Sequence, residues 1–184
     1  MEPVFDKDLL RRARLLEEQA LAEIYDRWSS GLYRYSMRLL GDVDLAEECV
    51  SETFSRFLQI LRDGGGPCDF LQAYLYRTAH NWITDHYRRN PAILVPLETN
   101  LTAEESTGTV QIVDQNLERQ QLRAALNCLT PDQRQVIILK FLEGWTNEAI
   151  ALAVKKPVGS VKSLQHRALE SLRRTLSSQE TKNE

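Results

Sequence analysis

The chain has 184 residues, enough for one domain or two small ones, and its 42% hydrophobic and 27% charged residues are typical of a globular protein in water. No apolar run approaches the length of a membrane span and no basic-then-apolar leader is present, so we expect a cytoplasmic protein without membrane insertion. The three cysteines and three histidines are not at metal-ligand spacing, and we find neither a Gly-rich phosphate loop nor a nucleophile–base pairing. We therefore expect no metal, no cofactor and no enzymatic activity.

The net charge of −3 argues against general attraction to nucleic acid, but the charges are strongly segregated. Residues 42–52 and residues 91–118 each hold five acids and no base. Residues 155–174 hold six lysines and arginines against Glu170 alone. Separate acidic and basic surfaces predict a protein that contacts two kinds of partner.

The first half of the chain shows helical spacing of apolar residues over 6–16, 18–28 and 32–40, with a cap or kink expected at 29–31. Asp42 is expected to cap a further helix over 43–61, which carries the five acids in its first turns. The helix dipole explains two or three of these acids. The others predict a negative surface that faces a partner.

A longer helix is expected from Asp69, as an acidic cap, to Asn90, which precedes a proline. One face is apolar, and an apolar face alone indicates only a core helix. A second stripe has hydrogen-bond donors at every position and no acid, and Trp82 and Arg89 flank it. Such a stripe suits phosphates and bases. It consists of Arg77, Asn81, Thr84 and Arg88.

Residues 91–116 contain two prolines, two Thr/Ser-rich segments and no sustained period, which predicts a flexible acidic linker. The expected fold is all-α, with two small helical domains. The N-terminal domain covers residues 1–90 and the C-terminal domain residues 117–176, followed by a short polar tail, 177–184.

The C-terminal domain has clear helix boundaries. Thr130-Pro131-Asp132-Gln133 forms a predicted capping box, and Thr146 caps a short helix over 147–154. A turn at 155–157 and a longer basic helix over 158–176 complete a helix-turn-helix. A solvated basic face is the alternative, and it is equally good for Arg173 and Arg174. The residues predicted to bind DNA are Lys155 and Lys156 in the turn, and Ser160, Lys162, Ser163, Gln165, His166 and Arg167 on the outer face.

These motifs resemble the bacterial extracytoplasmic-function (ECF) sigma factors of the sigma-70 family. The string LTPDQRQVIILKFLEGWTNEAIALAV, followed by VGSVKS, is similar to their promoter-binding C-terminal domain. The strings GLYRYSMRLLGDVDLAEECVSETFSRFLQIL and FLQAYLYRTAHNWITDHYRR are similar to their N-terminal domain. Two blocks in the right order make the resemblance more specific than a lone helix-turn-helix.

The resemblance implies a sigma factor that binds core RNA polymerase, directs it to promoter DNA and helps to melt the proximal promoter element. An anti-sigma factor is a usual partner in the family. Asn81 would meet the melting strand, Arg88 and Arg89 would hold adjacent backbone, and the helix that contains VGSVKS would recognise the distal element. The polymerase-binding residues would be Asp44, Glu47, Glu48, Glu52 and Arg56.

The chain departs from the family pattern at two informative places. Lys155 stands where a turn glycine is usual, which costs on the order of 1 kcal/mol if the position needs a positive φ. Leu164-Gln165 replaces a common basic-then-Leu pair, which directs Gln165 outward and should alter promoter preference.

Two other functions remain open from the sequence. The first is a conventional dimeric helix-turn-helix regulator that acts without core polymerase, and it predicts tight binding to a palindromic duplex. The second is a helical adaptor whose basic patch binds an acidic protein, and it predicts no promoter-dependent RNA product.

Overall fold

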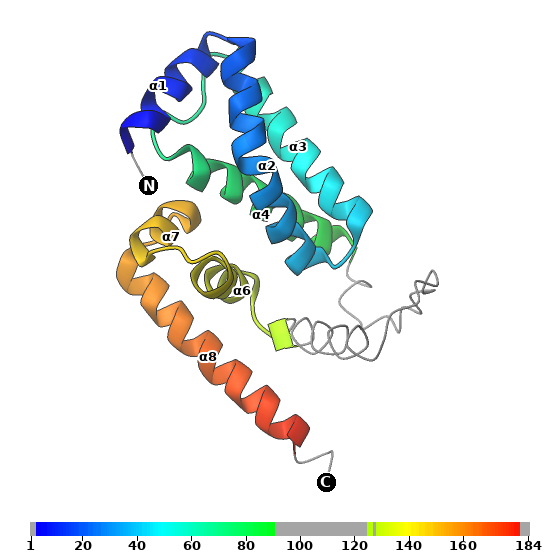
Figure 1. Cartoon of the computed structure of the whole chain (residues 1–184). Coiled ribbons are helices and arrows are strands. Elements are labelled where there is room, and N and C mark those ends of the chain that lie inside the picture. The colour runs from blue at the N-terminus through cyan, green and yellow to red at the C-terminus, as the bar shows by residue number, and fades with distance from the viewer. Residues whose placement is uncertain (1–2, 91–124, 127, 181–184) are drawn as a thin grey trace, which may run out of the picture.

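The computed structural model describes residues 3–90, 125, 126 and 128–180, and every element in this part of the chain is a helix, as predicted. Figure 1 shows an N-terminal group of helices, blue to green, and a C-terminal group, yellow to red, that meets the first group at α4. The N-terminal helices are α1 (Pro3–Arg14), α2 (Glu18–Leu40), α3 (Val43–Arg62) and α4 (Leu71–Arg89). The C-terminal helices are α6 (Pro131–Ile137), the π-helical turn η2 (Ile138–Leu142), α7 (Asn147–Val154) and α8 (Val158–Glu180).

The helix starts predicted from capping residues are largely confirmed. The Asp42 side chain accepts a hydrogen bond from the Leu45 amide at 2.9 Å, at the start of α3. Thr130 and Gln133 form both hydrogen bonds of the capping box before α6, and Thr146 caps α7 through the Ala149 amide. Each bond satisfies an amide that lacks a partner within its own helix, so these helices begin where the sequence predicts.

The helix cap predicted as one possibility at residues 29–31 is wrong, because α2 runs through them without interruption. Gly31 serves a different purpose there. A Cβ at this position would lie 2.7 Å from the Tyr76 hydroxyl oxygen, so the missing side chain makes room for the buried Tyr76 side chain of α4 beside α2. The helix ends at Gly41, whose φ of 76° is left-handed.

The start of α4 also differs from the prediction. Its N-cap is Phe70, which has a left-handed φ of 55° and no capping side chain. Asp69 instead forms an ion pair with Lys7 of α1 at 3.3 Å. The acid therefore ties the loop to α1 and does not cap the helix.

One continuous hydrophobic cluster supports the helices of both groups. In the N-terminal group, Ile24, Leu32, Phe57 and Leu75 are each no more than 1% exposed. Full burial of such a side chain contributes roughly 1.5–3 kcal/mol relative to exposure. The C-terminal helices all contribute fully buried side chains to the same cluster: Val136, Ile138, Leu139, Ile150, Ala153, Val161 and Ala168.

Some predicted boundaries cannot be compared with the structure. The predicted linker, residues 91–116, and the predicted start of the C-terminal domain at residue 117 lie outside the described residues. At the other end, α8 continues to Glu180, beyond the predicted helix end at Leu176, and so takes in part of the predicted tail. Figure 1 shows this end of α8 extending away from the N-terminal helices.

Candidate nucleic-acid and polymerase interfaces

The donor stripe of α4 begins with Arg77, and this side chain lies between the two groups of helices. Its Nε donates to the Ala153 carbonyl oxygen at 2.9 Å, and its Nη2 donates to the Leu152 carbonyl oxygen at 2.7 Å. Both carbonyls belong to the last turn of α7, where no intrahelical amide is available to them. Arg77 therefore caps α7, a contact that the sequence analysis did not predict.

The rest of the stripe has a more open environment. Asn81 is exposed and Thr84 is half-buried. Arg88 is exposed and pairs with Asp85 of the same helix at 3.1 Å. The stripe itself contains no acid, but the carboxylate of Asp85 thus lies next to it. Arg89 is exposed at the end of the helix. Asn81, Arg88 and Arg89 thus present donors to solvent, whereas Arg77 does not.

Trp82 stacks on His86, with 5.2 Å between the ring centroids and 20° between the planes. Both rings line a small cavity of about 120 Å³ between α3 and α4. The cavity also contains Arg89 and two predicted polymerase-binding residues, Glu48 and Arg56. Within the described part of the chain, the buried Nε2 of His86 has no hydrogen-bond partner. The structure therefore brings one end of the predicted DNA surface next to the predicted polymerase surface.

The acids of α3 form a solvent-facing surface, which we call the acidic face. Glu52 is half-buried and accepts a hydrogen bond from Nε of Arg56 at 2.7 Å, one helical turn away. The other three acids of this face, Asp44, Glu47 and Glu48, are exposed, so like charges lie together on one side of the helix.

The helix-turn-helix has the predicted order of α7, turn and α8. Lys155 ends α7 with a φ of 52° and a ψ of 43°, so this position does need the left-handed backbone that glycine adopts without strain. Lys156 pairs with Asp132 at 3.1 Å. These contacts fix the angle at which α8 leaves the turn.

Most of the predicted outer face of α8 is open to solvent. Lys162, Ser163, His166 and Arg167 are exposed, and Ser160 is half-buried. Gln165 is half-buried because its Nε2 donates to Oδ1 of Asn147, at the start of α7, at 2.8 Å. This bond leaves the Oε1 acceptor of Gln165 for another partner, and Asn147 is a residue that the sequence analysis missed.

The sequence analysis did not predict the interface between the two groups of helices, which combines an ion pair with a contact between aromatic rings. Arg38 of α2 pairs with Glu143, which follows η2, and the Glu143 side chain is only 9% exposed. The Tyr76 ring lies 4.8 Å from the Trp145 ring, centroid to centroid. Both rings are at least nine-tenths buried. The sequence analysis assigned no partner to any of these four residues.

His80 lies beneath this interface, with its Nδ1 2.9 Å from the Tyr35 hydroxyl oxygen. Burial lowers the pKa of His80 to about 4, partly opposed by the charge of Asp132. Burial also raises the pKa of Tyr35 well above its ordinary value. Both groups are therefore neutral near pH 7, as an interior without a compensating charge requires.

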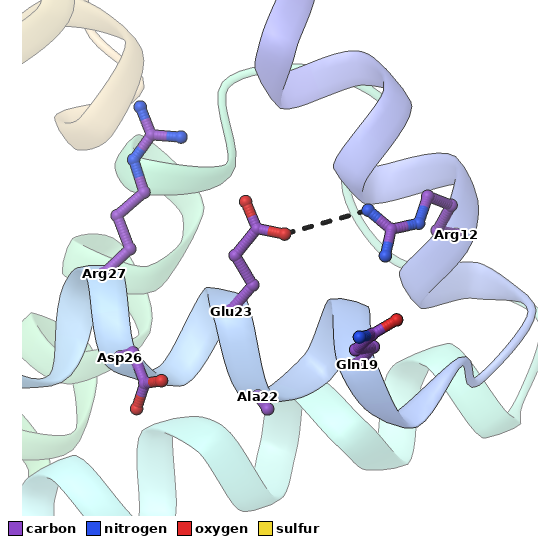
Figure 2. A pocket seen from close by; sticks show the side chains of 6 residues that line it. All are labelled: Arg12, Gln19, Ala22, Glu23, Asp26 and Arg27. Atoms are coloured by element: carbon purple, nitrogen blue, oxygen red, sulfur yellow. Dashed lines mark ion pairs between the residues drawn. The ribbon is translucent and has the colours of Figure 1, made fainter.

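A shallow depression lies between α1 and α2. Figure 2 shows its lining side chains, with Arg12 of α1 directed toward Glu23 of α2 at 3.7 Å. The depression has a volume of about 710 Å³ and includes acids and bases but none of the predicted site residues. It is shallow and open to solvent, whereas a ligand pocket encloses most of its ligand.

Within the described residues, no helix is long and apolar enough to cross a membrane. The same part of the chain contains no group of three or more His, Cys, Asp or Glu side chains arranged to hold a metal ion.

Solved structures of similar fold agree with this architecture. One is CnrH in complex with the cytosolic domain of CnrY, with a TM-score of 0.70 and 20% identity over 94% of this chain and 97% of that one. Another is the sigma factor RpoE in complex with the anti-sigma factor NepR from Bartonella quintana, with a TM-score of 0.60 and 23% identity over 85% of this chain and 96% of that one. At these identities the likeness establishes the fold.

Sequence comparison establishes the family. The model of Sigma-70 region 2 matches residues 24–92, and that of Sigma-70, region 4 matches residues 119–172. The ECF RNA polymerase sigma factor BldN of Streptomyces coelicolor is 32% identical over 92% of this chain, which spans 65% of the length of BldN. The ECF RNA polymerase sigma factor SigL of Mycobacterium tuberculosis is 32% identical over 89% of this chain and 93% of its own length. The chain therefore belongs to the ECF sigma factors of the sigma-70 family.

Proposed function

We propose that this ECF sigma factor binds core RNA polymerase with the acidic face of α3 and binds promoter DNA with α4 and α8. It directs the polymerase to specific promoters and helps to melt the proximal element. The observation that carries this division of labour is the separation of charge. Exposed acids gather on α3, whereas the exposed bases of the helix-turn-helix gather on α8. One surface thus suits a basic protein partner and the other suits phosphates.

We assign the proximal promoter element to α4. Asn81 and Arg88 are exposed on it, and the half-buried Trp82 offers a ring close to them. Unstacking a base costs a few kcal/mol, and stacking on a protein aromatic ring returns about 1–3 kcal/mol. Binding energy alone can therefore drive melting, so the proposed mechanism requires no catalytic residue, metal or cofactor.

We assign the distal element to α8. Side chains near the start of a recognition helix reach base edges in the major groove. Lys162 and Arg167 would hold phosphates, while Ser163 and Gln165 carry groups that bond base edges. Each phosphate contact would steepen the salt dependence of binding.

A conventional dimeric helix-turn-helix regulator is the less favoured function. It would explain α6 to α8 but not the region 2 match over residues 24–92 or the exposed acids of α3. We also propose that an anti-sigma factor regulates the chain in the cytoplasm. RpoE of Bartonella quintana is similar in fold and was solved in complex with such a factor.

An in vitro transcription assay tests the proposed function and its division of labour. The chain is added to core polymerase on a duplex promoter and on a template that is already melted at the proximal element. Arg167→Ala should weaken transcription from both templates, because upstream binding is needed for each. Asn81→Ala should impair the duplex template more, because only that template must be melted. Equal effects of Asn81→Ala on both templates would contradict the assignment of melting to α4.

A further inference from the structure

Gln165 of α8 is held in one orientation by a residue of the neighbouring helix. Its Nε2 donates to Oδ1 of Asn147, the first residue of α7, at 2.8 Å. Both side chains are half-buried. Thr146, and not Asn147, accepts the hydrogen bond that caps α7, so the Asn147 side chain is not needed to start this helix. The effect of the bond is to fix the amide of Gln165.

The fixed amide offers a defined pair of groups to a partner. A glutamine amide can turn over and so exchange its oxygen with its nitrogen, which carries two N–H groups. The bond to Asn147 removes this freedom, because one N–H of Nε2 must point at Oδ1 of Asn147. The groups that remain are the Oε1 acceptor and the second N–H. One acceptor thus lies beside one donor on the same plane.

Of the four bases, adenine alone complements this pair in the major groove. Adenine presents the N6 amine as a donor and N7 as an acceptor, and one glutamine amide can bond both. Guanine presents two acceptors, O6 and N7, so Oε1 would face an oxygen or a nitrogen that has no hydrogen to give. Cytosine lacks the acceptor and thymine lacks the donor. Each of these mismatches leaves a polar group without a partner, which costs free energy.

The other polar side chains on the outer face of α8 carry less information about the base. The Ser163 hydroxyl donates to the Gly159 carbonyl oxygen at 3.1 Å, but a hydroxyl can rotate to suit either kind of partner. Lys162 and Arg167 would hold phosphates, and phosphate contacts do not read sequence. Gln165 is therefore the side chain in which a fixed order of donor and acceptor can select one base.

We propose that Asn147 is a positioning residue for Gln165, and that the pair makes the chain select adenine over guanine at one position of the distal promoter element. The inference rests on the proposed function, which assigns the distal element to α8, and it adds the base that Gln165 reads. Asn147 acts through Gln165, by preventing the amide from turning its two N–H groups toward the DNA. The preference for adenine over guanine at this position should be roughly tenfold.

The position that Gln165 reads is found by selection. Core polymerase that carries the chain selects duplexes from a library randomised over the upstream promoter region, and the selection is repeated with Gln165→Leu. The position at which Gln165→Leu loses the base preference of the parent is the one that Gln165 reads. The parent should select adenine there. Selection of another base there, or a preference unchanged at every position in Gln165→Leu, would overturn the proposal.

Substitutions of Asn147 then test its positioning role through the ratio of affinities for adenine and guanine at that position. Asn147→Asp keeps an oxygen that accepts from Nε2 of Gln165, so the ratio should be preserved. Asn147→Lys offers only a donor, which can bond Oε1 and not Nε2. The amide then turns its N–H groups toward the DNA, where they suit O6 and N7 of guanine. The ratio should fall roughly tenfold.

Glu148→Gln is the matched control, because it raises the net charge by the same amount as Asn147→Lys at the adjacent, exposed residue. It should change the overall affinity and leave the ratio unchanged. Asn147→Ala removes the bond without adding a charge, so it provides an independent reading if Asn147→Lys impairs folding, and it should also lower the ratio. A ratio equal to that of the parent in Asn147→Ala and in every folded Asn147→Lys sample would overturn the positioning role.

The selection also separates this inference from the proposed function. If the parent enriches no upstream sequence, the assignment of the distal element to α8 fails, and the inference fails with it. If the parent enriches a sequence but the ratio does not depend on Asn147, the assignment stands and the inference fails. A ratio that is preserved in Asn147→Asp and lost in Asn147→Lys would support both.

Discussion

Replacing Lys155 with glycine should stabilise the protein. Lys155 has a φ of 52° and a ψ of 43° at the end of α7, where its amide donates to the Ala151 carbonyl. A side chain with a Cβ pays about 1–2 kcal/mol for this left-handed conformation. Glycine avoids that strain but loses about 0.5–1 kcal/mol through the greater freedom of the unfolded chain. The expected net gain in the free energy of unfolding is therefore about 0–1.5 kcal/mol, with a central value of about 0.75 kcal/mol.

Urea unfolding measures this gain as a shift of the midpoint at constant m-value. Lys155→Ala is the matched control, because it removes the same charged side chain and keeps the Cβ. The alanine variant should have nearly the stability of the parent, since the Lys155 side chain is exposed. Equal stability of the glycine and alanine variants would refute the argument from backbone strain.

The same pair of variants separates stability from DNA binding. Both lose the positive charge of Lys155, which the sequence analysis predicts to bind DNA, so both should bind the distal element with a shallower salt dependence if that charge contacts a phosphate. If the glycine variant alone lost affinity, the backbone geometry of the turn would matter for binding more than the charge.

Three further predictions follow from single contacts. Gly31→Ala should destabilise the protein by about 1–3 kcal/mol in urea unfolding, because its Cβ would lie 2.7 Å from the buried Tyr76 hydroxyl. Gly159→Ala is the control and should not destabilise the protein, because a Cβ at that position has no atom within 4 Å. Burial lowers the pKa of His80 from 6.5 to about 4 in the folded chain. As the pH falls, His80 is therefore protonated in the unfolded chain before it is protonated in the folded chain, which favours unfolding. The free energy of unfolding should thus be fully retained above about pH 6.5 and fall by about 2 kcal/mol by pH 5, a loss absent in His80→Asn and kept in His166→Asn. Asn147→Ala frees the Gln165 amide and should relax base preference at one position of the distal element, measured by binding to a set of single-base variants; an unchanged preference would show that the 2.8 Å bond does not orient Gln165.

Local chemistry accounts for what the sequence predicted well. Capping by Asp42, Thr130 and Thr146 depends on residues within one turn of each other, so sequence spacing alone identifies it. The left-handed backbone at Lys155 was suggested by the family resemblance, in which a glycine is usual at this turn position, and the structure has it. The all-α fold follows from the same helical periodicity.

The failures arise where the deciding partner is distant in the chain. Gly31 looked like a helix breaker, but its role depends on Tyr76 of another helix. Asp69 looked like a cap, but Lys7 of α1 is its partner. Arg77 looked like a free donor because no local pattern reveals that α7 ends beside it. Periodicity reports how exposed a face is within one helix, and it cannot report what packs against that face.

The central claim is that the exposed acids of α3 bind core polymerase. Its most direct test is co-elution of the purified chain with core enzyme in size-exclusion chromatography at low ionic strength, where attraction between charges is least screened. The chain should co-elute with the enzyme, and the double variant Glu47→Lys, Glu48→Lys should not, although it keeps its helical circular dichroism. A chain that elutes separately from core polymerase, or a charge-reversed variant that co-elutes as well as the parent, would contradict the claim.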